Sequence, residues 1–203
     1  KNEREYYDKY WDDIHPFVKY GCLREEKFYD KVKDILIYKT IKGDHVTLKD
    51  YLDRNKKAHE NKVFYVTDEK QQSQYIRMFK EQDMETVILN SMIDTHFIQF
   101  IEMKNDKVKF TRIDADLSDN MKDKENEKGF DEAKTELLVK IFRTAAEDEK
   151  LEVKIESLKT PDTPAIILLS EQSRRMQDMS KFYGGMNISE DMFPTEKTLI
   201  LNS

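Results

Sequence analysis

Residues 62–103 read KVFYVTDEKQQSQYIRMFKEQDMETVILNSMIDTHFIQFIEM, and this stretch decides the fold because short apolar runs alternate in it with helical patterns. The runs at 63–67 and 86–89 are rich in β-branched and aromatic residues, which favour strands. The segment between them has a helical pattern that Asp68 can cap, and a second helical pattern follows with Asp94 as its expected cap. Near-continuous apolar strands joined by a helix predict a parallel pair that is covered by helices on both faces.

Helical patterns precede this stretch. Aromatic and aliphatic residues recur at helical spacing over residues 2–18, and Pro16 is expected to end that helix. The aromatic stripe is compatible with a ligand site, but core packing is the better interpretation, because aromatic rings bury large areas and carry no directional chemistry by themselves. We predict a second helix over residues 24–36, a turn at Gly43 and a third helix with Thr47 as its N-cap.

The chain then continues through an edge strand and a charged segment into a second lobe. Residues 108–113 alternate between apolar and polar side chains, which predicts a half-buried strand at the edge of the sheet. Residues 116–128 are too charged to bury much surface, so we interpret them as a solvated linker or a frayed helix start. Residues 130–145 have the clearest amphipathic helical pattern in the chain, and this helix introduces the second lobe.

The second lobe contains three strand patterns. Residues 151–155 alternate strictly and residues 165–169 are a continuous apolar run, so we expect these two strands to form a hairpin. Residues 198–201 are expected to add a third strand, and Ser170 can cap a helix between the second and third strands. The whole pattern predicts the α/β class (α+β overall): a small α-β-α sandwich with a short, mainly parallel sheet, then a small α+β lobe with a three-stranded sheet.

Composition and charge narrow the functional class. Of the 203 residues, 37% are charged, against a usual figure of about 25%, which indicates solvated helical faces and a charged connector. The net charge is −6 and the basic residues are interspersed, so nucleic acid is a poor candidate partner. The single cysteine, Cys22, excludes an intrachain disulfide, and the longest apolar run is far shorter than the roughly eighteen residues of a membrane span. We therefore expect a soluble, cytoplasmic protein with no membrane partner.

The usual signatures of catalysis are absent from the sequence. With only five glycines, neither a phosphate-binding P-loop nor a dinucleotide-binding fingerprint can be written. No metal-ligand cluster can be formed from the scattered histidines, His15, His45, His59 and His96. Cys22 has no evident base beside it and is better interpreted as a buried or half-buried thiol. We therefore assign no catalytic, cofactor-binding or metal-ligating residue.

Several segments occur in an order and spacing that carry a family resemblance. They are residues 6–11, 17–21, 47–54, 63–67, 92–94, 170–176, Met179 and 199–202. In this order the chain resembles the bacterial form of the ninety-kilodalton heat-shock chaperone family, the high-temperature protein G type. The chain departs from that family's pattern at Asn55, where methionine is usual, and at Asp68, where glycine is usual.

The resemblance implies that residues 1–115 are the later part of the chaperone's middle domain, residues 116–129 a charged connector and residues 130–203 the start of the C-terminal domain. It also implies that the ATP-binding domain, the catalytic loop and the dimerisation helices lie outside the chain, which begins at Lys1 without a methionine and ends soon after a strand pattern. We therefore expect no ATPase activity in this fragment, whereas the parent protein uses ATP and Mg²⁺. The parent is implied to be a homodimer, and the fragment is expected to be monomeric or weakly associating.

The resemblance also implies a function: a segment of an ATP-dependent molecular chaperone that binds and remodels unfolded or partly folded client proteins, and that supplies client-contact and hinge surface. One alternative is a stand-alone α/β small-molecule-binding enzyme that uses the strand ends near Asp68 and Asp94, where open α/β sheets often place ligands. Helix capping explains both aspartates more simply. A purely structural adaptor is the third possibility.

The expected client-contact residues are Met176, Met179, Phe182 and Tyr183, on the helix that Ser170 caps. Methionine suits this role because its unbranched, polarizable side chain adapts to many partner shapes. The alternative is that the stripe packs on the three-stranded sheet. The surrounding side chains are very polar, which argues against deep burial of the stripe.

Overall fold

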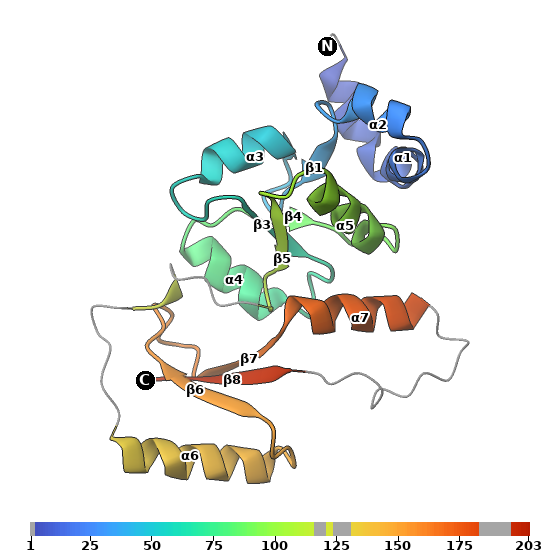
Figure 1. The fold of residues 1–203 in the computed structure, drawn as a ribbon. Helices are drawn as coiled ribbons and strands as arrows, with labels where there is room; N and C mark the ends of the chain where they lie inside the picture. Colours follow the sequence, from blue (N-terminus) through green and yellow to red (C-terminus); the bar gives the residue numbers. More distant parts are fainter. Residues whose placement is uncertain (1–2, 116–120, 124–130, 183–195) are drawn as a thin grey trace. The chain divides into compact units, whose positions relative to one another are not determined.

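The structure is a computed structural model that describes residues 3–115, 121–123, 131–182 and 196–203. The chain forms two compact units, Lys1–Ile113 and Asp114–Ser203. Within the described residues, the first unit contains a two-stranded and a three-stranded sheet, and the second contains another three-stranded sheet (Figure 1). The predicted α/β class, α+β overall with two lobes, is confirmed.

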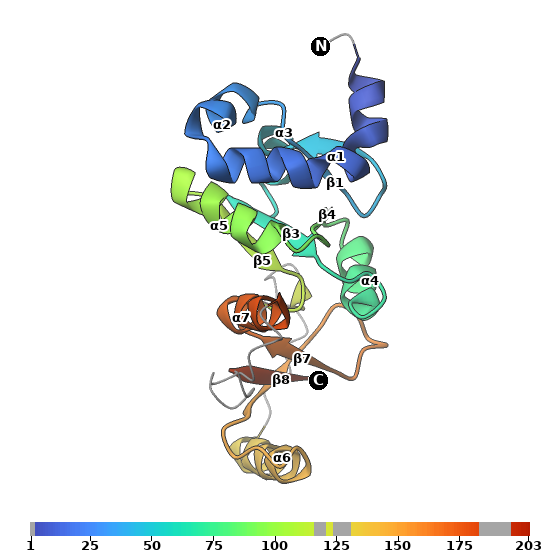
Figure 2. The same ribbon diagram turned by 90° about the vertical axis from the view of Figure 1, so that its right-hand side faces the viewer.

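The three-stranded sheet of the first unit has β3 at its centre. Its strands are β3 (Lys62–Val66), β4 (Val87–Ile88) and β5 (Lys109–Arg112), and both outer strands run parallel to β3. Two helices connect them, α4 (Ser73–Glu81) and α5 (Asp94–Lys104), and these lie on opposite sides of the sheet (Figures 1 and 2). The predicted β-α-β-α unit and the edge position of the last strand are therefore confirmed.

Burial explains why β3 is central. Its four residues from Val63 to Val66 are buried, as a parallel strand with a helix on each face requires. On one side Phe64 meets Phe79 of α4, with ring centroids 5.0 Å apart in an edge-to-face arrangement. Tyr75, also on α4, is only half-buried.

The first helix is longer than predicted. Helix α1 (Arg4–Arg24) continues through Pro16, so the expectation that this proline ends the helix is wrong. Proline removes one backbone hydrogen bond and kinks a helix. Trp11 before it and Cys22 after it are buried in the same core, and this packing stabilises the helix on both sides of the proline. Figure 2 shows α1 changing direction along its length.

Helix α2 (Glu26–Val32) follows α1 and leads into a hairpin that the sequence analysis did not predict. Its strands are β1 (Ile37–Lys39) and β2 (His45–Thr47). The helix expected over 24–36 ends at Val32, and Ile35, which is 56% exposed, lies outside it. Gly43 makes the predicted turn with a φ of 92°, a conformation that disfavours residues with a Cβ.

Helix α3 (Leu48–Asn55) begins as predicted. The Thr47 hydroxyl accepts a hydrogen bond from the Asp50 backbone N–H at 3.1 Å and donates one to the Asp50 carboxylate at 2.7 Å. This pair satisfies one of the helix's orphan N–H groups and fixes the direction in which the chain leaves β2.

The second unit has a different strand order from the one predicted. Its elements are α6 (Glu132–Ala145), β6 (Glu152–Glu156), β7 (Ala165–Leu169), α7 (Glu171–Phe182) and β8 (Lys197–Asn202). The last strand, β8, lies between the other two, parallel to β6 and antiparallel to β7. The predicted β6–β7 hairpin is therefore wrong.

Side-chain character accounts for this order. Successive residues of β8, Leu199 and Ile200, point to opposite faces of the sheet and are both buried, which suits a central strand. In β6 the charged Glu152 and Lys154 are exposed, which suits an edge strand. The charged segment at 116–128 lies mostly outside the described residues, so its interpretation as a linker stays a prediction.

Candidate functional site

Helix α7 carries the expected client-contact residues, and its first turn is held by several polar contacts. Ser170 is its cap, as predicted, since the Ser170 hydroxyl accepts a hydrogen bond from the Ser173 N–H at 3.2 Å. Arg175 pairs with Glu171 one turn earlier in the same helix, with 2.7 Å between Nε and Oε1. Arg174 instead reaches out of the helix to Asp114, with 2.9 Å between Nη2 and Oδ2.

The apolar stripe of α7 is partly described. Met176 and Met179 are half-buried on a helix whose other described side chains are polar. The Phe182 side chain and Tyr183 lie outside the described residues. The assignment of Met176, Met179, Phe182 and Tyr183 to client contact therefore stays a prediction.

Asp68 follows β3 but does not cap α4 as predicted. Its carboxylate accepts hydrogen bonds from the backbone N–H groups of Lys70 at 2.9 Å and Gln71 at 3.0 Å, and these bonds hold the pKa of the carboxyl below its usual range. The helix begins later, at Ser73, after a turn that Asp68 initiates. An aspartate carboxylate that accepts hydrogen bonds from N–H groups two and three residues later forms a short turn, and it is then not available to cap a helix that begins further along the chain.

Asp94 is the first residue of α5 and, contrary to the prediction, it is not the N-cap, which is Ile93. One carboxylate oxygen accepts a hydrogen bond from the Ser91 N–H at 2.9 Å, and the other pairs with the buried Lys19 ammonium of α1. Burial lowers the pKa of Lys19, while the Asp94 carboxylate opposes that shift. Asp94 thus joins two helices through a buried ion pair.

A polar cavity of about 240 Å³ lies beside this pair, where β4 ends. Its lining includes Lys19, His15, Lys39 and Asn90. His15 lies beside Trp11, with the two ring centroids 5.9 Å apart. Burial lowers the pKa of the His15 imidazole, and the nearby Lys19 charge lowers it further.

The carboxylates of Asp68 and Asp94 are both engaged by internal contacts, so neither strand end supports the enzyme alternative.

Two other candidates for chemistry are the Cys22 thiol and a metal site. Cys22 is buried, as predicted, and burial raises the pKa of its thiol to about 11, so it is a poor nucleophile. Within the described ranges, no three His, Cys, Asp or Glu side chains come together in a way that would hold a metal ion. Nor does any helix there have the length and apolar character needed to cross a membrane.

Comparison with known proteins decides the family. The sequence model described as "Hsp90 protein" matches residues 1–202. The chain belongs to the Hsp90 family. Chaperone protein HtpG of Bacteroides fragilis (strain 638R) is 30% identical to it over 213 aligned positions, which cover 100% of this chain and 31% of that protein.

Two further relatives carry the same description. Chaperone protein HtpG of Porphyromonas gingivalis (strain W83) is 28% identical over 100% of this chain and 31% of its own length. That of Bdellovibrio bacteriovorus is 22% identical over 94% of this chain and 32% of its own length. The chain thus spans about a third of the curated Hsp90-family relatives that it matches, and the resemblance to the high-temperature protein G type is confirmed.

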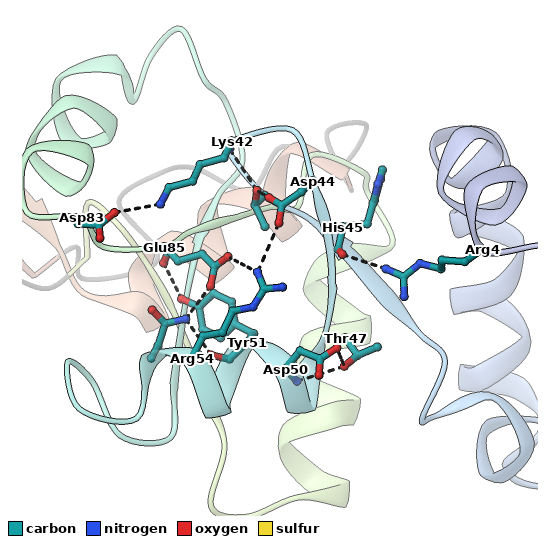
Figure 3. Close-up of polar contacts among 12 residues, drawn as sticks. Arg4, Lys42, Asp44, His45, Thr47, Asp50, Tyr51, Arg54, Asp83 and Glu85 are labelled. Atoms are coloured by element: carbon teal, nitrogen blue, oxygen red, sulfur yellow. Dashed lines mark hydrogen bonds and ion pairs between the residues drawn. The ribbon is translucent and has the colours of Figure 1, made fainter. Parts of the chain in front are cut away.

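A polar network around Glu85 includes Tyr51 and Arg54 of α3 (Figure 3). The Asn55 side-chain amide donates to the Glu85 carboxylate and to the Tyr51 carbonyl, both at 2.8 Å. Arg54 lies 3.3 Å from the same carboxylate and 3.4 Å from Asp44. The Asn55 amide and the Arg54 guanidinium thus each contact one oxygen of the buried Glu85 carboxylate.

Tyr51 completes this network. Its hydroxyl donates to the Glu85 carbonyl at 2.7 Å and accepts from the Phe64 N–H at 3.1 Å, and burial raises its pKa. It thereby joins α3 to β3 and to the segment before β4. The sequence analysis missed this network because Glu85 lies about thirty residues along the chain from its partners on α3 and no local pattern relates them. We interpret this network as structural.

Proposed function

We propose that the chain is a segment of an ATP-dependent chaperone that binds unfolded or partly folded client proteins, and that α7 supplies the client contact. The observation that carries the proposal is the half-buried Met176 and Met179 on a very polar helix, in a chain of the Hsp90 family. A stripe meant only for core packing is usually buried more fully, whereas a stripe for transient partners stays partly accessible.

The chemistry of the stripe suits clients that differ in sequence. Methionine has three rotatable bonds and a polarizable sulfur, so it can contact many apolar shapes without a fixed pocket. The neighbouring charged and amide side chains keep the surface soluble when no client is bound. Phe182 and Tyr183 are proposed to extend the same stripe.

The nucleotide chemistry belongs to other parts of the parent protein in this proposal. The chain has no phosphate-binding loop, so ATP and Mg²⁺ are proposed to act in the parent's upstream domains, and the homodimer is proposed to form through segments beyond this one. Residues 1–115 are proposed as the later part of the middle domain, 116–129 as a connector and 130–203 as the start of the C-terminal domain. We also propose a cytoplasmic location.

A matched pair of double variants tests the client contact. Met176→Ser with Met179→Ser should weaken binding to a permanently unfolded, fluorescently labelled model protein by about tenfold or more, while the melting temperature changes little. The control is Leu137→Ser with Ile141→Ser on α6, which removes two exposed apolar side chains, 58% and 49% exposed, from the same unit. Equal loss of binding in both variants, or unfolding of the first one, would refute the proposal.

A further inference from the structure

The chain enters the second unit at Asp114, and this residue is fixed to both ends of the β7–α7 connection. Its backbone carbonyl accepts a hydrogen bond from the Leu169 N–H, at the end of β7, at 3.2 Å. Its carboxylate pairs with Arg174, in the first turn of α7, at 2.9 Å. The entry point of the unit and the start of α7 are therefore joined through one residue.

The preceding residue is fixed just as firmly to the first unit. The Ile113 N–H donates to the Tyr65 carbonyl of β3 at 3.1 Å, which continues the parallel pairing of β5. Along the chain, adjacent residues thus contact the central sheet of the first unit and, in the second unit, the first turn of α7.

The Arg174–Asp114 contact is well protected from water. The exposed fractions of the two side chains are 17% and 4%, so solvent screens this pair much less than the surface pairs of the chain. A charge-assisted hydrogen bond in such a setting is among the stronger contacts available to a side chain. It can therefore determine where α7 lies.

We propose that Arg174 is a positioning residue: it clamps the client-contact helix to Asp114, where the chain enters the second unit, and so fixes the orientation of α7 within that unit. The client part of this statement rests on the proposed function, but the clamp does not. In this arrangement α7 presents its stripe to clients already ordered, so that little conformational entropy is lost when a client binds.

Arg175 provides the matched control. It has the same side chain, sits one position further along α7 and also makes an ion pair, but its partner, Glu171, belongs to the same helix. Replacing Arg175 removes an arginine and an ion pair without releasing α7 from Asp114. A difference between variants at positions 174 and 175 therefore reports the clamp and not the mere loss of charge.

Hydrogen–deuterium exchange of the 203-residue chain tests the clamp directly. Arg174→Met should raise amide exchange in α7 by roughly tenfold, the effect of losing a charge-assisted hydrogen bond, while β3 and β8 exchange as before. Arg175→Met should change α7 far less. The charge-reversed double variant Asp114→Arg with Arg174→Asp should restore slow exchange. Equal effects of the two single variants, or no restoration by the reversed pair, would overturn the proposal.

Client affinity then separates this inference from the proposed function. Arg174→Met should weaken binding of the unfolded model protein severalfold, and the reversed pair should recover it. If Met176→Ser with Met179→Ser leaves binding unchanged, the proposed function fails while the exchange experiment still decides the clamp. If the methionine variant loses binding but Arg174→Met exchanges and binds like wild type, the clamp alone is overturned.

Discussion

Replacing Lys19 by methionine should destabilise the first unit strongly, because it leaves a buried charge without its partner. Both side chains of the Lys19–Asp94 pair are only 4% exposed. Breaking a buried pair by removing one member typically costs about 3–5 kcal/mol. The Asp94 carboxylate keeps its hydrogen bond from the Ser91 N–H, so we expect the lower end of that range, about 3 kcal/mol.

Two further variants make the reasoning specific. Lys19→Met combined with Asp94→Asn removes both charges and keeps an acceptor for the Ser91 N–H, so it should cost only about 1 kcal/mol. Lys42→Met breaks the exposed ion pair with Asp83, 3.0 Å long, and should cost under about 1 kcal/mol.

Urea denaturation followed by circular dichroism measures all three free energies of unfolding. A single-variant cost below about 1 kcal/mol, or a double variant less stable than Lys19→Met alone, would refute the reasoning, because the buried charge would then not be the source of the penalty.

Three other outcomes follow from the structure. Asn55→Met should cost about 1–3 kcal/mol in chemical denaturation, since it leaves the buried Glu85 carboxylate without its amide partner. Burial lowers the pKa of His15, so the folded state binds a proton at this imidazole less readily than the unfolded state does. The contribution of neutral His15 to stability should therefore be fully present above its ordinary pKa of about 6.5 and fall as the pH drops below that value. His15→Gln should flatten this fall in a series of melting curves recorded at different pH values. Calorimetric titration of the chain with ATP and Mg²⁺ should show no binding heat, because no phosphate-binding loop is present in its sequence, and saturable micromolar binding would contradict this.

Local patterns were enough to predict much of the fold. The β-α-β-α unit around β3, the Thr47 cap and the long amphipathic helix α6 all depend on residues close together in sequence. The errors have a common cause. Whether Pro16 ends a helix, and whether β6 pairs with β7 or with β8, depends on what the distant chain buries against these segments.

The site could be predicted less completely for the same reason. Periodicity placed α7 and its methionines, and Ser170 marked where the helix starts. The partner of Arg174 could not be read from the sequence, since Asp114 is far away in the chain and a carboxylate near a predicted strand end is common. Likewise Asp94 looked like a helix cap, whereas it pairs with Lys19, 75 positions away.

Photo-crosslinking tests the central claim, client contact by α7, most directly. A photoreactive amino acid is placed at Met176 in one preparation and, as the matched control, at Ile141 of α6 in another, and each is irradiated with an unfolded model protein. The account predicts strong crosslinking from position 176, competed by excess unlabelled client, and little from position 141. Equal crosslinking from both positions, or crosslinking from position 141 alone, would contradict it.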